Sequence, residues 1–216
     1  MSECLEVISR GVTSGDSALV VSKIGQALKE GFTAGDILHR ALIPGIQALG
    51  KLFKDGEAYL PEILISTRAM NNGIEQLRPH LSETEMSRKG VVVIGTVEGD
   101  MHDIGKNLVK LMLDSNGFTV HDIGVDVSPD TFVKETQATG ADIVAVSALL
   151  TTTMLRIPDI VQALGAANLR DRVKIMIGGA PVTRAFASSI GAEGYADDCA
   201  SAVDEAEQLM RQAGEK

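Results

Sequence analysis

The sequence predicts an N-terminal bundle of four helices followed by an α/β domain with a five-stranded parallel sheet. From about residue 14 to residue 80, apolar residues recur at helical spacing, whereas after Gly90 short apolar runs alternate with helical segments. Between these two patterns, the polar stretch LSETEMSRKG at residues 81–90 suits a linker. We therefore assign residues 1–85 to a helical domain and residues 86–216 to an α/β domain.

The helical half shows its spacing most clearly at Leu38, Leu42, Ile46, Leu49 and Phe53. The pattern is broken in EGFTAGD and KDGEAYLPE, where turns are expected. Thr33 and Asp36 resemble an N-terminal helix cap, and Pro61 suits the first turn of a further helix. These signals predict four helices of unequal length.

The second half contains five apolar runs that predict strands, namely VVVIG, FTVHDIG, DIVAVSALL, KIMIGG and the weaker EGYA. Ser128 and Pro129 indicate the start of a helix between the second and third strands. For five parallel strands with helices on both faces, we expect the flavodoxin-like (Rossmann-like) order 2-1-3-4-5. A crevice then opens at the carboxyl ends of strands 1 and 3, where the loops after strands 1, 3 and 4 should meet.

Composition excludes several classes of function. A formal net charge of -9 and an aromatic content of 3% argue against a nucleic-acid partner. No apolar stretch approaches the roughly 20 residues of a membrane span, and MSECLEVISRG lacks the features of a signal peptide. We expect a cytoplasmic protein with no membrane partner. Cys4 and Cys199 have no metal-binding spacing, so we expect two free thiols.

The loop after the first predicted strand, EGDMHDIGKN at residues 98–107, contains three carboxylates and one histidine: Glu98, Asp100, His102 and Asp103. The carboxylates would repel the phosphate of a flavin mononucleotide. A phospho-accepting receiver domain is also disfavoured, because Ser147 stands where its aspartate is needed. A single imidazole cannot hold a bare metal ion, but it can complete the coordination of a metal already held by a macrocycle.

Three motifs now point to a family. DMHDIG, SALLTTT from Ser147 and the glycine pair Gly178 and Gly179 together resemble the cobalamin-binding signature of the corrinoid methyltransferase family. LGKLFKDGEAYLPEILISTRAMNNGIEQL resembles the helical cap module that precedes this domain in methionine synthase and in the corrinoid proteins of methanol, methylamine and O-demethylase systems. The two modules cover nearly the whole chain, so we expect a stand-alone corrinoid carrier rather than a complete methionine synthase.

The resemblance implies a cofactor, cobalamin or a related corrinoid, and a role for each matching residue. His102 would replace the benzimidazole of the cofactor as the lower cobalt ligand. Asp100 would hydrogen-bond the imidazole, and Thr153 would be the third member of this relay, where methionine synthase has serine. The nucleotide tail of the cofactor would pass Ser147, Gly178 and Gly179, Thr151 would face the corrin amides, and Phe53 and Leu60 would lie over the upper face. The remaining cofactor-binding residues implied are Asp103, Ile104, Gly105 and Leu149.

Simpler interpretations stay open for some of these residues. Asp103 is a rival to Asp100 as the partner of the imidazole, or it caps the helix that begins near Ile104. Phe53 and Leu60 could belong to an ordinary helical core. We expect the other histidines, at positions 39, 80 and 121, to be surface or structural residues.

By resemblance, the protein carries a methyl group from a substrate-specific methyltransferase to an acceptor methyltransferase, with a reductive activation protein as a third partner. We expect no catalysis without these partners, and a homodimer stays open. Because partners must reach the methyl group, the cap has to move, with a hinge at residues 81–90. A cobalamin-dependent sensor is the alternative, but this acidic chain lacks a DNA-binding region; a mutase subunit would lack the helical cap. The sequence leaves methanol, methylamines, quaternary amines and aryl methyl ethers open as methyl donors.

Overall fold

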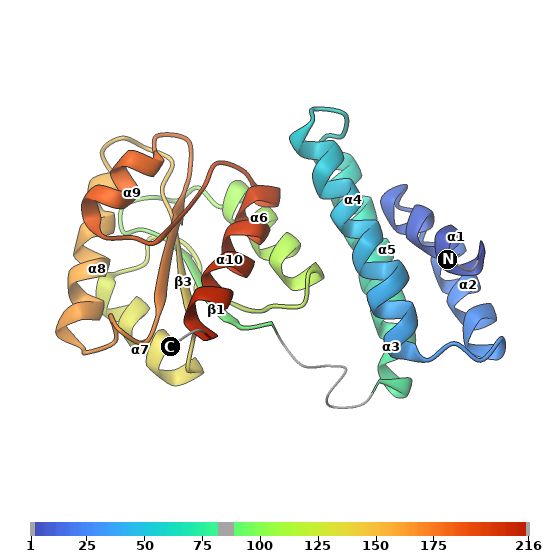
Figure 1. The fold of residues 1–216 in the computed structure, drawn as a ribbon. Helices are drawn as coiled ribbons and strands as arrows, with labels where there is room; N and C mark the ends of the chain where they lie inside the picture. Colours follow the sequence, from blue (N-terminus) through green and yellow to red (C-terminus); the bar gives the residue numbers. More distant parts are fainter. Residues whose placement is uncertain (1–2, 82–88, 215–216) are drawn as a thin grey trace. The chain divides into compact units, whose positions relative to one another are not determined.

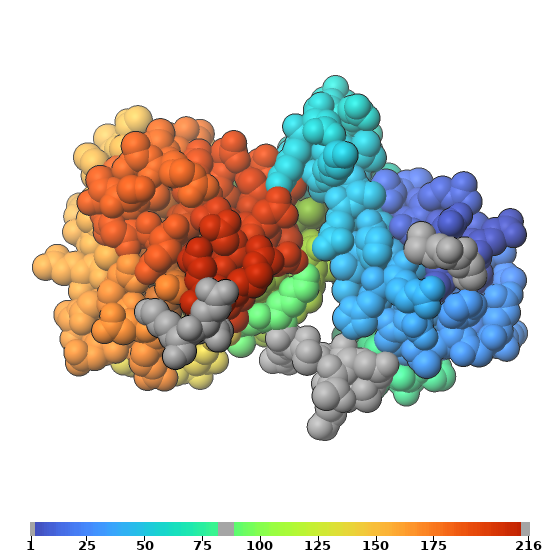
Figure 2. Space-filling view, viewed as in Figure 1, coloured from blue at the N-terminus to red at the C-terminus, as the bar shows by residue number. Residues whose placement is uncertain are grey.

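The computed structural model describes residues 3–81 and 89–214, which belong to two units, Met1–Ser87 and Arg88–Lys216 (Figure 1). The predicted boundary between residues 85 and 86, and most of the predicted linker and hinge, lie outside the described residues. Figure 2 shows the side chains of each unit closely packed, with the helical unit coloured from blue through cyan to bluish green and the α/β unit from green to red.

The helical unit consists of α1 (Glu3–Thr13), α2 (Ser17–Lys29), α3 (Ala34–Ile37), the π-helical turn η1 (Leu38–Leu42), α4 (Ile43–Lys54), α5 (Leu60–Leu77) and the 3-10 turn η2 (Arg78–His80). Because α3, η1 and α4 follow one another without a break, the described residues form four long helical segments, as predicted. The expectation that the helical pattern begins near residue 14 was wrong. Leu5, Ile8 and Val12 already bury one face of α1, at the spacing of a helix.

The predicted start signals of this unit lie where the sequence placed them. Thr33 caps α3, because its hydroxyl accepts a hydrogen bond of 3.0 Å from the Asp36 amide. Pro61 lies in the first turn of α5. Glu62 also accepts a hydrogen bond from the Tyr59 amide, at 3.1 Å, which fixes the entry into α5.

The α/β unit consists of β1 (Val91–Thr96), α6 (Ile104–Ser115), β2 (Thr119–Asp122), α7 (Pro129–Thr139), β3 (Ile143–Ser147), the 3-10 turn η3 (Met154–Arg156), α8 (Ile157–Ala166), β4 (Lys174–Gly178), α9 (Arg184–Ile190), β5 (Gly194–Ala196) and α10 (Cys199–Gly214). The strands are parallel in the order β2-β1-β3-β4-β5, which confirms the flavodoxin-like prediction. Ser128 caps α7 as expected, accepting from the Thr131 amide.

Helices cover both faces of this sheet (Figure 1), with α7 and α8 on one side and α6 and α10 on the other. The core on the first side joins strand residues such as Val144 and Ile175 to Phe132 of α7 and Ile160 of α8. Alternate strand residues face α6 and α10, so both faces are apolar, as parallel strands require. Cys4 and Cys199 are free, as predicted, and burial raises the pKa of the Cys199 thiol to about 11.

Candidate cofactor-binding site

The register of the sheet brings the ends of three strands side by side. Thr96 at the end of β1 pairs with Ser147 at the end of β3, and Ser147 pairs with Gly178 at the end of β4. The loops that follow these strands therefore leave the same edge of the sheet, as the strand order predicted. The loops after β1 and β3 contact each other directly, because the Leu149 amide of the second loop donates a hydrogen bond to the Asp100 carboxylate of the first.

The glycine pair at the end of β4 is required by packing inside the unit. Gly179 has φ +123°, and a Cβ atom there would lie 1.9 Å from the carbonyl oxygen of Ala148. A Cβ atom on Gly178 would lie 2.8 Å from the carbonyl oxygen of Ala196. Backbone contacts therefore explain both glycines, with Ala148 after β3 for Gly179 and with Ala196 at the end of β5 for Gly178. Their role beside a nucleotide tail stays a prediction.

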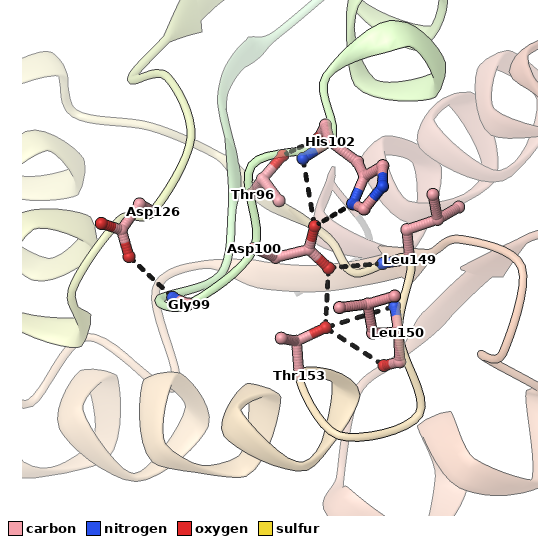
Figure 3. Close-up of polar contacts among 8 residues, drawn as sticks. All are labelled: Thr96, Gly99, Asp100, His102, Asp126, Leu149, Leu150 and Thr153. Carbon is pink, nitrogen blue, oxygen red and sulfur yellow. Dashed lines mark hydrogen bonds and ion pairs between the residues drawn. The ribbon is translucent and has the colours of Figure 1, made fainter.

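Asp100 is the centre of a buried hydrogen-bond relay (Figure 3). Its side chain has an exposed fraction of 0%, while its carboxylate meets polar groups on both oxygens. Oδ1 lies 2.7 Å from Nδ1 of His102 and accepts a second bond of 3.1 Å from the His102 amide. Oδ2 accepts bonds from the Leu149 amide at 2.8 Å and from the Thr153 hydroxyl at 2.6 Å. All four bonds satisfy one carboxylate, so the carboxyl group is fixed in position.

These bonds decide the charge of Asp100. Burial by itself raises the pKa of a carboxyl group, but the bonds from Thr153, Leu149 and His102 outweigh burial and hold the pKa of Asp100 well below its usual range. The hydroxyl of Thr153 has one proton, and 2.6 Å to Asp100 is a shorter contact than 3.1 Å to the carbonyl oxygen of Leu150. Thr153 therefore donates to an ionised carboxylate.

His102 combines a fixed orientation with an exposed ring. Because Asp100 is ionised and can only accept, Nδ1 of His102 has to be the protonated nitrogen of the neutral ring. Nε2 is then the unprotonated nitrogen, and it has no hydrogen-bond partner among the described residues. The His102 side chain is 52% exposed. The relay thus presents a lone pair to the outside of the unit, in the form that binds a metal.

Apolar side chains surround this imidazole on the surface. Met101 and Ile104 beside it are 69% and 72% exposed, and Leu149 and Leu150 of the facing loop are 41% and 42% exposed. A cluster of exposed apolar side chains beside an imidazole is typical of a ligand-binding surface. A Cβ atom on Gly105 would meet nothing within 4 Å, so no contact within the described residues requires glycine in this helix.

The remaining predicted residues of this unit are Asp103, Ser147 and Thr151. Asp103 stands at the N-cap of α6, but its side chain makes no capping bond and instead accepts from Nδ2 of Asn107 at 3.1 Å. The alternative in which Asp103 orients the imidazole was therefore wrong, whereas Asp103 is the N-cap residue of the helix that begins at Ile104, as the second alternative expected. Ser147 ends β3, and Thr151 is exposed in the following loop.

Phe53 and Leu60 lie in the helical unit, at the end of α4 and the start of α5. Phe53 is half-buried and Leu60 is 41% exposed, so neither belongs to the buried core. Tyr59, Leu64 and Ile65 nearby in the chain are also exposed. The interpretation of Phe53 and Leu60 as core residues was wrong, and their position over a cofactor stays a prediction.

Two residues that hold the loop after β1 were missed from the sequence. The Thr96 hydroxyl donates to the carbonyl oxygen of His102 at 2.9 Å, and Asp126 accepts from the Gly99 amide at 2.7 Å (Figure 3). Thr96 could have been found as a polar residue at the end of an apolar strand. Asp126 lies in the GVD turn that follows β2, and the sequence there indicates only an ordinary turn.

The fold and the site define a protein that exposes a fixed histidine at the carboxyl edge of a flavodoxin-like sheet. Comparison with known families agrees: the model of the B12 binding domain matches residues 90–209, and a second B12 binding domain model matches residues 5–78. The chain is 40% identical to dimethylamine corrinoid protein 2 of Methanosarcina acetivorans over 209 residues, which is 96% of each chain.

Solved structures of similar proteins cover both units. A cobalamin-binding protein from Desulfitobacterium hafniense has a TM-score of 0.82 at 27% identity, with 95% of this chain and 98% of that chain covered. The methanol:cobalamin methyltransferase complex of Methanosarcina barkeri has a TM-score of 0.84 at 29% identity, with 97% and 80% covered. The chain belongs to the family of corrinoid proteins built from B12-binding domains. Among the described residues, no helix is long and apolar enough to cross a membrane.

Proposed function

We propose that this corrinoid protein binds cobalamin with His102 as the lower cobalt ligand and carries a methyl group between two methyltransferases. One observation carries the proposal. Thr153, Asp100 and His102 form a continuous relay from the interior of the unit to an exposed imidazole whose Nε2 has no hydrogen-bond partner among the described residues. An imidazole that only packs in a core has no need to be half exposed and also fixed by a buried carboxylate. A metal ligand needs both features.

The surroundings of His102 fit a corrin ring. A flat macrocycle has a broad apolar face, and the exposed side chains of Met101, Ile104, Leu149 and Leu150 offer apolar surface on two sides of the imidazole. The open space at Gly105 allows close approach to the start of α6. The negative charge of Asp100 lies one hydrogen bond behind the ring and raises its basicity as a ligand.

When bound, the cofactor would supply a cobalt atom that accepts and releases the methyl group. The protein supplies orientation and proton control. Asp100 fixes the tautomer of His102, so that Nε2 keeps its lone pair, and Thr153 stabilises the carboxylate that does this.

The carrier role draws its support from the similar proteins. One relative is named for dimethylamine, and one solved structure is a methanol methyltransferase complex. We infer partners of the same kind here: a methyltransferase specific for a methylated amine or alcohol, an acceptor methyltransferase and a reductive activation protein.

The ligand assignment is tested by labelling histidine with ¹⁵N and replacing His102 with Ala. In the parent, electron paramagnetic resonance of bound cob(II)alamin should show coupling to a histidine nitrogen, and His102→Ala should lose this coupling while keeping its circular dichroism spectrum. His121→Ala is the matched control, because His121 is an exposed histidine of β2 in the same unit. Histidine coupling that survives in His102→Ala would refute the assignment.

The carrier role needs its own test. The cobalamin-loaded, reduced protein is incubated with methyltransferases specific for dimethylamine, trimethylamine or methanol, each with its methyl donor. We expect the methylcobalamin spectrum to form with one of them and to disappear when an acceptor methyltransferase is added. If no donor system methylates the protein, and the adenosyl form instead changes its oligomeric state in light, the sensor alternative is correct.

A further inference from the structure

The loop after β1, which presents Asp100 and His102, is held by a residue outside the predicted site. Asp126 lies in the loop after β2, and its Oδ1 accepts from the Gly99 amide at 2.7 Å. The Asp126 amide donates to the carbonyl oxygen of Asp100 at 3.0 Å. Figure 3 shows Asp126 directed at Gly99, next to the relay. One residue thus satisfies a donor and an acceptor on two consecutive residues of the loop.

The backbone at Asp126 is adapted to this contact. Its φ is +54°, a left-handed conformation that aspartate and asparagine tolerate better than most residues. Gly99, on the other side of the contact, has φ +83°. Glycine adopts a positive φ readily, but the left-handed conformation of Asp126 costs free energy, which the hydrogen bonds between the two loops offset.

We propose that Asp126 is a positioning residue that fixes the Gly99–Asp100 backbone and thereby keeps the Asp100 carboxylate in place behind His102. The inference rests on the proposed function of His102. Thr96 holds the far side of the same loop through the carbonyl oxygen of His102. The carboxylate therefore stands between two backbone anchors, one on each side.

Asp126 acts through an accepted hydrogen bond rather than through its charge, which gives the proposal a specific signature. Asparagine at this position would retain an oxygen that can accept from the Gly99 amide and would tolerate the left-handed conformation. Glycine there would relieve the backbone but remove the acceptor. Asp126→Asn should therefore behave like the parent, and Asp126→Gly should not.

The chain offers a matched control at the opposite edge of the sheet. Asp142, which directly precedes β3, accepts from the Val91 amide at 2.8 Å through Oδ2, and its own amide donates to the Val91 carbonyl oxygen at 2.8 Å. The same residue type thus makes the same two kinds of bond, here to both backbone groups of the first residue of β1 rather than to two consecutive residues. Asp142→Gly removes the bond from the Val91 amide, which lies at the start of β1, whereas the relay lies after the end of β1.

The experiment compares Asp126→Gly, Asp126→Asn and Asp142→Gly in the full chain. The first measurement is amide hydrogen exchange in the protein without cofactor. Asp126→Gly should speed exchange at Gly99 about fivefold or more, the factor for one lost hydrogen bond. Asp126→Asn should restore the parent rate, and Asp142→Gly should speed exchange at Val91 but not at Gly99.

The second measurement is the dissociation constant for cobalamin, with the ¹⁵N-histidine coupling of the cob(II)alamin form. For Asp126→Gly we expect affinity to fall about tenfold, as when a supporting partner of a metal ligand is removed, with part of the histidine coupling lost. Asp126→Asn and Asp142→Gly should both stay within about twofold of the parent, although Asp142→Gly loses stability.

Two results would overturn the proposal. One is fast exchange at Gly99 in Asp126→Gly with parent affinity and full histidine coupling, since Asp126 would then only stabilise the loop. The other is an Asp126→Asn protein as impaired as Asp126→Gly, since the charge would then matter rather than the bond. Exchange at Gly99 is measured without cofactor. It therefore tests whether Asp126 fixes the Gly99 backbone, even if His102→Ala shows that cobalt is bound in another way.

Discussion

The loop after β1 and the corner between α4 and α5 present different kinds of surface. In the loop, the exposed imidazole of His102 is fixed from behind by a fully buried carboxylate. At the corner, Tyr59 and Leu60 are 66% and 41% exposed, and Glu62 is bonded only to the backbone of the turn. The loop is organised by contacts within its own unit, whereas the apolar corner has no partner within the described part of its unit that explains its exposed side chains.

This difference affects what each region can reveal about function. The hydrogen bonds of the relay lead from Thr153 through Asp100 to His102. In the neutral ring they leave Nε2 as the nitrogen with a lone pair, which can bind a metal. An exposed apolar surface reveals only that something apolar covers it. The predictions below test whether the loop is as constrained, and the corner as tolerant, as this comparison implies.

The largest effect is expected where the loops after β3 and β4 touch. In Gly179→Ala the new Cβ atom would lie 1.9 Å from the Ala148 oxygen at a φ of +123°, so both strain and overlap oppose the substitution. We expect a loss of about 3 kcal/mol or more in the free energy of unfolding. Gly140→Ala is the control, because Gly140 has φ +63° with nothing within 4 Å, and should cost about 1 kcal/mol. Equal losses in urea denaturation would show that overlap contributes nothing.

The second effect concerns the pH dependence of stability. Asp100 has a pKa well below the usual range in the folded protein, whereas a carboxyl group in the unfolded chain has a pKa of about 3.9. Its contribution to stability is therefore complete above about pH 5 and is lost as the pH falls toward the folded pKa. Asp100→Asn should cost about 2 kcal/mol at neutral pH, and this difference from the parent should shrink below about pH 4.

The measurement compares urea midpoints of parent and Asp100→Asn from pH 7 to pH 2. Only two tyrosines are present in the sequence, so a Tyr59→Phe background leaves Tyr195 of β5 as the fluorescent reporter of the α/β unit. Taking the difference cancels the titration of the other carboxylates. A difference that stays constant over this range would mean that Asp100 is not held ionised by the relay.

Most of the fold followed from the sequence because burial gives a periodic signal. The strand order was predictable, since five apolar runs separated by helical segments allow few arrangements. The helical pattern was recognised only from about residue 14, because the apolar face of α1 comprises only a few residues near the chain start. The π-helical turn at Leu38–Leu42 was not predictable, since the spacing of Leu38, Leu42 and Ile46 is equally compatible with a regular helix.

The site was predictable in part for a similar reason. His102 and Asp100 are two positions apart, so their contact is local and visible in a motif. The contact between Thr153 and Asp100 spans 53 positions and came only from resemblance. The contact between Asp126 and Gly99 spans 27 positions, and nothing in the local sequence distinguishes it from an ordinary turn. Long-range bonds to backbone atoms leave little trace in the side-chain pattern.

A smaller effect is expected at the apolar corner. Phe53→Ala should cost about 1–2 kcal/mol, because the ring is half-buried, and Leu60→Ala less than about 1 kcal/mol. Ile63→Ala is the control on the same helix as Leu60, with a fully buried side chain and an expected cost of about 3 kcal/mol. If Phe53 lies over the cofactor, Phe53→Ala should also speed the photolysis of bound methylcobalamin with little change in affinity. Unchanged photolysis would refute the position of Phe53 over the cofactor, and a loss of stability as large as that of Ile63→Ala would contradict the half-buried position of its ring.

The smallest effect should come from Thr153→Ser, at the inner end of the relay. Serine keeps the hydroxyl that donates to Asp100 at 2.6 Å and accepts from the Leu150 amide at 3.3 Å. Only a buried methyl group is lost, so we expect about 0.5 kcal/mol of stability to be lost and the histidine coupling of cob(II)alamin to be unchanged. Thr153→Val is the matched variant, because valine keeps the shape of threonine but lacks the hydroxyl. Oδ2 of Asp100 then has one donor fewer, and we expect the free energy of unfolding to fall by about 1–3 kcal/mol. If Thr153→Ser weakens cobalamin binding as much as Thr153→Val does, then the methyl group rather than the hydrogen bond sets the position of Asp100.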